Sequence, residues 1–133
     1  MGYGVQIFGC LQEFREDPEA FFERLSNMGY RQIEPCVLFG DASVFPQRLA
    51  DLVWKPQEVL GFQELMGRYG LVLRSCHVFS KDMLAAAEEM LALAQESSID
   101  TYVVNCPAGI EKDYAAFAQD CRTLAGRLEE EGI

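Results

Sequence analysis

The sequence predicts an α/β fold in which four βα units follow one another within a single domain, residues 1–133. Short apolar runs alternate with longer segments whose apolar residues recur every three or four positions, the spacing of an amphipathic helix. One run, Tyr102-Val103-Val104, is apolar throughout, as is typical of a strand in a parallel sheet covered on both faces. A TIM barrel and a doubly wound sheet both satisfy this alternation, so the pattern leaves both architectures open.

The first unit has the clearest boundaries. Residues 3–8 form a short, mostly apolar run and predict the first strand. The first helix is predicted to begin at Asp17-Pro18-Glu19, because Asp17 can cap free N–H groups and proline suits the first helical position. Gly29 is placed to end this helix. Its apolar face is predicted to consist of Phe21, Phe22, Leu25 and Met28.

The second strand is predicted at residues 30–34, and Pro35 is expected to close it. The connector at residues 36–56 carries more apolar side chains than a plain surface loop, namely Leu38, Phe39, Phe45 and Trp54. We favour packing of this connector against its own barrel over a lid that folds onto a substrate.

The remaining elements keep the same order. Helices are predicted at residues 59–69, 83–94 and 114–128, and strands at residues 71–77 and 102–105. Gly29 and Gly70 each lead from a helix straight into a strand, and Gly132 repeats that signal. A barrel of eight units needs about 200–250 residues. We therefore expect the chain to be the N-terminal half of a longer barrel, with a half-barrel completed by dimerisation as the alternative.

The charge balance excludes some classes of partner. The formal net charge is −10, whereas binding to nucleic acid needs clustered Lys and Arg. No apolar run approaches the roughly 18 residues of a membrane span, and the N-terminus lacks the features of a signal peptide. The five cysteines are odd in number and widely spaced, and we interpret them as reduced thiols. We expect a cytoplasmic protein that binds neither nucleic acid nor membrane.

Three stretches carry a resemblance to a known family. They are residues 17–34, from Asp17-Pro18-Glu19 to Ile33-Glu34, residues 69–77, which end in Cys76-His77, and residues 102–109, which include Asn105-Cys106-Pro107. In this order and spacing they resemble the N-terminal half of the xylose isomerase-like TIM-barrel family, which contains sugar phosphate isomerases and epimerases. The resemblance implies a fold of the TIM-barrel type with four βα units present.

The resemblance also implies a function. Family members are metal-dependent enzymes that isomerise, epimerise or dehydrate small sugars, polyols or their phosphates, by proton transfer next to a carbonyl. Their divalent cation (Mn, Mg, Co or Zn) is held mostly by residues of strands five to eight. We therefore expect this chain to supply only part of the wall of the substrate-binding site and to be inactive alone. The expected substrate is a small sugar, polyol or sugar phosphate, and a homo-oligomer is a possible assembly.

A related branch of the same fold is the apurinic endonucleases. That branch places a zinc-binding histidine at the end of the third strand, where His77 stands, and usually a further histidine where this chain has Cys106. This departure, together with the acidic charge, makes a DNA-repair enzyme the weaker interpretation.

Glu34, His77 and Asn105 stand at strand ends, where enzymes of this fold place their sites. Glu34 is predicted to be catalytic and substrate-binding, because an unpaired carboxylate at the end of an apolar strand would be costly to bury. Its structural alternative is an ion pair with an arginine such as Arg74. His77 is the sole histidine and is predicted in the same two roles, with a neutral core histidine hydrogen-bonded to the backbone as the alternative.

Asn105 is predicted to bind substrate, since its amide both donates and accepts, and a turn before Cys106-Pro107 is the alternative. Lys81 is interpreted as a solvated loop charge rather than a phosphate ligand. A soft-metal site made of cysteines is conceivable. Strand alternation argues against it, because Cys76 points outward if His77 points into the barrel. The cysteines considered for that site are Cys10, Cys36, Cys76 and Cys106.

The competing class is a non-catalytic α/β binding module, either flavodoxin-like or a self-associating half-barrel. The phosphate-binding pattern G-x-G-x-x-G of a dinucleotide fold is missing after the first strand, where the chain reads Phe8-Gly9-Cys10-Leu11. Exposed strand edges in an open half-barrel would favour self-association.

Overall fold

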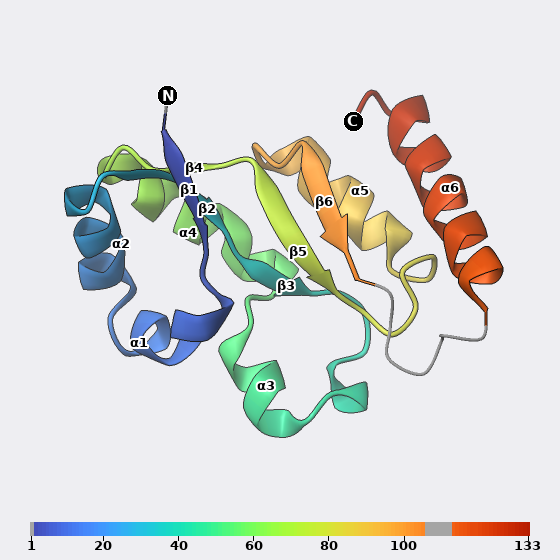
Figure 1. Ribbon diagram of the computed structural model, residues 1–133, viewed down its shortest axis with the longest axis horizontal. Coiled ribbons are helices and arrows are strands. Elements are labelled where there is room, and N and C mark those ends of the chain that lie inside the picture. The colour runs from blue at the N-terminus through green and yellow to red at the C-terminus, as the bar shows by residue number, and fades with distance from the viewer. Residues whose placement is uncertain (1, 106–112) are drawn as a thin grey trace.

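The computed structural model describes residues 2–105 and 113–133. Its strands and helices alternate along the chain, with two further strands where the second and third strands are interrupted (Figure 1). The strands are β1 (Tyr3–Gln6), β2 (Tyr30–Glu34), β3 (Cys36–Leu38), β4 (Val72–Leu73), β5 (Ser75–Phe79) and β6 (Thr101–Val104). The helices are α1 (Leu11–Glu16), α2 (Pro18–Asn27), α3 (Gln47–Leu52), α4 (Pro56–Arg68), α5 (Ala87–Glu96) and α6 (Tyr114–Glu130).

The strands form two parallel sheets that meet end to end. One sheet has the order β1-β2-β4 and the other β3-β5-β6. Only Pro35 separates β2 from β3, and only Arg74 separates β4 from β5. The His77 N–H donates to the Pro35 carbonyl at 2.8 Å, which joins the two sheets across the breaks. The strands therefore lie side by side in the order of the sequence, as in a barrel, whereas a doubly wound sheet reverses its order at a switch point.

The helices cover one side of this sheet. Figure 1 looks onto the other side, and α4 and α5 pass behind the strands. Side chains alternate accordingly: Ile33, Leu73 and Cys76 are fully buried toward the helices, whereas Gln6 and Gln32 are exposed on the near side. Among the described residues, no helix covers the near side of the sheet.

The centre of the core is a cluster of five aromatic rings, which we call the aromatic cluster: Phe14, Phe21, Phe22, Trp54 and Phe62. Phe14 lies in its middle and contacts the other four rings at centroid distances of 4.8 to 5.7 Å. Four different segments supply these rings, from α1, α2, α4 and the residues before α4. The cluster therefore fixes how the first two units pack together.

The helix boundaries of the first unit follow the sequence prediction. The Asp17 carboxylate accepts a hydrogen bond from the Ala20 N–H at 3.0 Å, and Pro18 occupies the first turn of α2. Gly29 and Gly70 have φ angles of 91° and 67°, in the left-handed region that an L side chain rarely adopts. Both glycines therefore end their helices in the manner predicted.

Several predicted boundaries were wrong. The third strand is interrupted at Arg74 and does not end at His77, because β5 continues to Phe79. Pro35 does not close the second strand, because β3 continues it, and the proline ring costs no hydrogen bond there since its carbonyl is the group that pairs. The third helix begins at Ala87 rather than at Met83, after a turn in which the Asp82 carboxylate accepts from the Ala85 N–H. Helices α1 and α3 lie in stretches that the sequence analysis left without structure.

The connector between β3 and α4 packs against its own barrel, as favoured from the sequence. Trp54 is fully buried, and its backbone pairs with β3 through the Cys36 carbonyl and the Leu38 N–H. Phe45 is half-buried, with its ring centroid 6.0 Å from that of Phe79. Packing against the barrel therefore explains why this segment carries so many apolar side chains.

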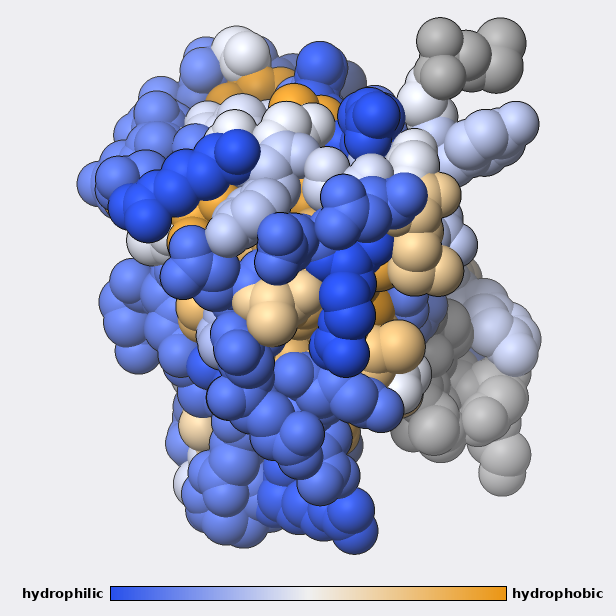
Figure 2. Space-filling view, turned by 90° about the vertical axis from the view of Figure 1, so that its left-hand side faces the viewer, coloured by the Kyte–Doolittle hydropathy of each residue, from blue (hydrophilic) through white to orange (hydrophobic). Residues whose placement is uncertain are grey.

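The end of the molecule formed by α1 and α2 has a mostly hydrophilic surface, and hydrophobic residues show there only in small areas (Figure 2). Within the described part of the chain, no helix has the length and apolar character needed to cross a membrane.

Candidate functional site

Glu34, Ser75 and His77 come together on the side of the sheet opposite the helices. The Ser75 hydroxyl donates to Glu34 Oε2 at 2.8 Å, and His77 Nδ1 lies 3.4 Å from Glu34 Oε1. Glu34 ends β2, while Ser75 and His77 belong to β5. Two of the predicted site residues are thus in contact, and a serine that the sequence analysis did not single out links to them.

A slip in the strand at Arg74 produces this arrangement. Leu73 and Cys76 are both fully buried toward the helices, although strict alternation would place residues three apart on opposite sides. The extra residue lies between β4 and β5, and it brings Ser75 and His77 to the side of Glu34. Such irregularities commonly re-aim side chains next to functional sites.

Glu34 does not form the ion pair considered as its structural alternative. Arg74 instead pairs with Asp100, and its guanidinium beside that carboxylate lowers the pKa of Asp100. The Glu34 side chain is 25% exposed and borders a hollow of about 230 Å³ that Gln6, Gln32 and Ser75 also line. Its carboxylate is therefore oriented by Ser75 and His77 and still open to a ligand.

His77 does not match its structural alternative either, because its ring contacts a carboxylate rather than a backbone group. Its Nε2 atom is buried, and among the described residues no group forms a hydrogen bond with it. The side chain as a whole is 17% exposed. A buried polar atom without a partner is unusual in a folded protein and is a frequent property of functional sites.

Asn105 does not touch Glu34 or His77. It follows β6, where His77 is in register with Val103, so Asn105 stands two residues further toward the strand ends. Two residues along a strand correspond to about 7 Å. Because residues in register share a side of the sheet, Asn105 lies on the side of His77 and is exposed.

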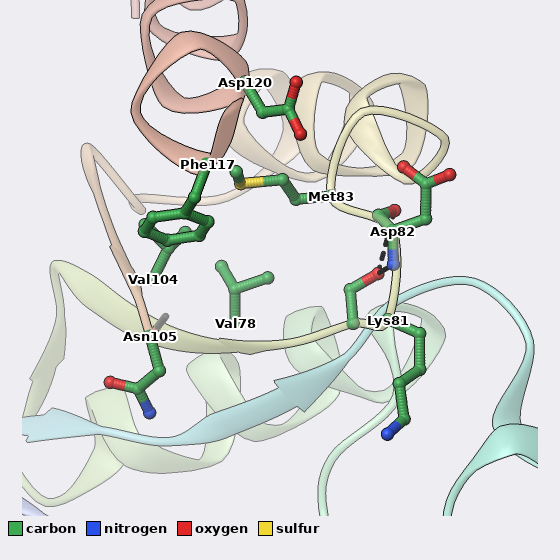
Figure 3. A pocket seen from close by; sticks show the side chains of 9 residues that line it. Val78, Lys81, Asp82, Met83, Val104, Asn105, Phe117 and Asp120 are labelled. Carbon is green, nitrogen blue, oxygen red and sulfur yellow. Dashed lines mark hydrogen bonds between the residues drawn. The ribbon is translucent and has the colours of Figure 1, made fainter. Parts of the chain in front are cut away.

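A cavity of about 290 Å³ lies between the ends of β5 and β6 and helix α6. In Figure 3 the side chains of Val78, Val104 and Phe117 point toward one another across it, whereas Lys81 and the Asn105 amide point away. The lining is therefore apolar at its centre. This cavity lies on the helix side of the sheet, apart from the Glu34–His77 pair.

The structure can be compared with known proteins. No protein-family model matches the chain, and no curated protein matches it at significant similarity. Among solved structures, the crystal structure of a sugar phosphate isomerase/epimerase from Parabacteroides distasonis superposes with a TM-score of 0.75 at 16% sequence identity. The match covers 99% of this chain and 49% of the other. The chain therefore spans about half the length of the structure it matches.

The chain has the fold of half a TIM barrel. The sequential strand order and the superposition agree on this point. The sequence analysis predicted this fold class, and the prediction is confirmed. The doubly wound alternative is excluded by the order β1, β2/β3, β4/β5, β6.

The half-barrel does not assemble a metal centre from its described residues. No group of three or more His, Cys, Asp or Glu side chains is placed there to hold a metal ion. Glu34 and His77 alone fall short of the ligand number that a divalent cation requires in proteins. The divalent metal implied by the resemblance stays a prediction.

Lys81 and the cysteines occupy separate places. Lys81 is exposed, with its Nζ atom 5.6 Å from the centroid of the Phe45 ring. Cys76 is buried on the helix side, while the Cys36 thiol accepts from the Gln6 amide at 3.1 Å. Cys10 is exposed, unlike Cys36 and Cys76. Cys106, which bears on the endonuclease comparison, lies outside the described residues.

Thiol reactivity should differ sharply within the half-barrel. Burial, reinforced by the nearby Glu34 charge, raises the pKa of Cys36 to about 12 and also raises the pKa of Cys76. Because the thiolate is the reactive form, we expect Cys10 to react with iodoacetamide at pH 8 at least about 100 times faster than Cys36. Peptide mass spectrometry over a time course measures both rates. Equal rates in the folded protein would contradict this burial, and in urea the difference should disappear.

Proposed function

We propose that this half-barrel belongs to the sugar phosphate isomerase/epimerase family and supplies part of the substrate-binding wall of such an enzyme. The observation that carries the proposal is the Glu34–His77 contact on the side of the sheet opposite the helices. The solved structure that superposes on the chain supports the same fold. Enzymes with this fold place their active sites at the carboxyl ends of the strands. Glu34 ends β2, and His77 lies in β5 two residues before its end.

The proposed chemistry is proton transfer at a carbon next to a carbonyl. Glu34 is ready to accept a hydrogen bond from a sugar hydroxyl or to take up a proton, because Ser75 and His77 each engage a different carboxylate oxygen and fix its orientation. Asn105 stands about 7 Å further along, a distance that the carbon chain of a sugar spans. Its amide is proposed to orient a second hydroxyl.

The experiment is hydrogen–deuterium exchange of a panel of aldose and ketose phosphates in D2O, followed by proton NMR. The catalyst is the full polypeptide that the source cell produces, with its intact mass measured first. We expect exchange next to the carbonyl for at least one sugar, and a loss of about 100-fold or more in kcat/KM for Glu34→Gln, because a positioned acid or base contributes at least that factor. His77→Gln should lower kcat/KM about tenfold or more.

Glu96→Gln is the matched control, since Glu96 is exposed at the end of α5 and its side chain forms no hydrogen bond or ion pair with any of the described residues. Exchange should be unchanged in this variant. Absence of exchange with every sugar and sugar phosphate would refute the proposal. So would robust isomerase turnover by the 133 residues alone, because the half-barrel is proposed to supply only part of the site.

A second candidate is a half-barrel that associates with a second copy. The observation that favours it is that β1 and β6 each pair with another strand on one side only within the described sheets. Unpaired strand edges promote association. A stable dimer of a 133-residue polypeptide in sedimentation experiments would favour this candidate, and a source-cell polypeptide of about twice the length would favour the enzyme.

A further inference from the structure

We propose that Ser75 is a positioning residue that acts through Glu34 to hold His77 as the neutral tautomer with its proton on Nδ1. The ring then presents Nε2 as an acceptor. The inference deepens the proposed function, and rests on it only in naming a sugar hydroxyl as the group that Nε2 receives. The tautomer itself is a property of the chain without ligand.

Ser75 orients the Glu34 carboxylate. The Ser75 hydroxyl donates to Glu34 Oε2 at 2.8 Å, so this oxygen is engaged and the plane of the carboxylate is fixed. The other oxygen, Oε1, is the one that faces His77 Nδ1 at 3.4 Å. An ionised carboxylate accepts hydrogen bonds and donates none. The proton between these two groups therefore belongs to Nδ1.

The other ring nitrogen, His77 Nε2, is buried and has no partner among the described residues. An imidazolium, or the tautomer with its proton on Nε2, would bury an unsatisfied N–H donor, and the latter would also set a bare Nδ1 against the carboxylate. Both alternatives are disfavoured by the same geometry. The Nδ1–H tautomer avoids both problems, because its N–H faces the Glu34 carboxylate and the buried Nε2 carries no hydrogen.

The tautomer of His77 determines which chemical group of a ligand it can bind. A bare Nε2 accepts a hydrogen bond, so its partner must be a donor, such as a hydroxyl group of a polyol or sugar. The His77 side chain is 17% exposed, whereas its Nε2 atom is buried. A ligand reaches it by displacing the atoms that cover it. Ser75, two residues along the same strand, thereby decides which chemical group His77 can recognise.

The test is NMR of the chain labelled with ¹⁵N-histidine, at mildly alkaline pH. His77 is the sole histidine, so the spectrum reports one ring, and the two nitrogens resonate in separate ranges according to which carries the proton. We expect the Nδ1–H form to exceed the Nε2–H form by about tenfold, a modest factor because 3.4 Å is long for a charge-assisted hydrogen bond. A predominant Nε2–H form would overturn the inference.

Three variants separate positioning from a merely structural role. Ser75→Ala should lower the ratio of the Nδ1–H to the Nε2–H form to about twofold or less, since a Glu34 carboxylate that rotates freely no longer holds Oε1 toward Nδ1. Ser75→Thr should restore it. Glu34→Gln should reverse the ratio, because an amide can donate to Nδ1. Ser43→Ala, which removes an exposed hydroxyl in the connector, is the control that should leave the ratio unchanged.

An unchanged ratio in folded Ser75→Ala would refute the positioning role. Circular dichroism of each variant confirms that it is folded. This outcome is distinguishable from failure of the proposed function, because the tautomer is measured without any substrate. Absence of sugar exchange with the expected tautomer present would remove the isomerase proposal and leave the role of Ser75 standing.

Discussion

Replacement of Phe14 by alanine is expected to lower the free energy of unfolding by about 3–5 kcal/mol, the range for truncating a fully buried aromatic side chain. Phe14 is completely buried, and its ring contacts Trp54 at 5.1 Å and Phe62 at 4.8 Å between centroids. Truncation opens a cavity between four rings that come from different segments, which limits collapse around it. Urea denaturation followed by circular dichroism measures the loss.

Tyr114→Ala provides the matched control for aromatic truncation. Its side chain is 59% exposed at the start of α6, and we expect a change within about 1 kcal/mol. Equal losses for the two variants would show that the aromatic cluster is not the main core. A Phe14→Leu variant should recover part of the stability, because it refills much of the volume.

Arg15→Met is expected to cost about 2–4 kcal/mol, because the change leaves a half-buried carboxylate without its cation. The guanidinium contacts both oxygens of Glu58, at 2.7 and 2.9 Å, and donates to the carbonyls of Leu52 and Val53. One side chain thus joins α1 to the end of α3, to Val53 and to α4. Methionine keeps most of the aliphatic stem, so the loss reports the polar contacts.

The effect of Arg15→Met should depend on pH. Burial alone would raise the pKa of Glu58, but the hydrogen bonds from Arg15 and the Lys55 N–H outweigh it and hold that pKa below its ordinary value. A carboxyl whose folded pKa is lowered stabilises the protein above its unfolded value, about 4.3, and loses this effect as the pH falls through the folded pKa. The stability difference from the native chain should therefore shrink below about pH 4.

The control for Arg15 is Arg68→Met. Arg68 is 62% exposed and lies 3.6 Å from Glu64 one helical turn away, so its removal should cost less than about 0.5 kcal/mol. Urea titrations at several pH values provide the comparison. A difference between native and Arg15→Met that stays constant from pH 7 to pH 3 would contradict the assigned role of Glu58.

Local signals in the sequence predicted most elements of the fold. Asp17-Pro18 marked the start of α2, and Gly29 and Gly70 marked helix ends, because each of these residues acts within its own turn. Helix α1 was missed, since a single pair of apolar residues, Leu11 and Phe14, is too short a period to recognise. Its stability comes from tertiary contacts of Phe14 and Arg15, which no local pattern reveals.

The candidate site was only partly predictable. Glu34 and His77 were singled out because the sequence predicted a strand end at each of them. The structure places Glu34 at the end of β2 but His77 within β5, two residues before its end. Ser75 was missed because strict alternation gives no reason for the slip at Arg74 that turns it toward Glu34. The separate position of Asn105 follows from the register of β5 and β6, which residues far apart in the sequence determine together.

The aromatic cluster also bears on the order of events while the protein is being made. Its five rings all lie within residues 14–62, so they emerge from the ribosome ahead of β5, β6 and α6. Chains are synthesised at roughly 5–20 residues per second, far more slowly than hydrophobic collapse. The first two units can therefore bury their aromatic side chains during translation. The strands that emerge later can then pack against these two units.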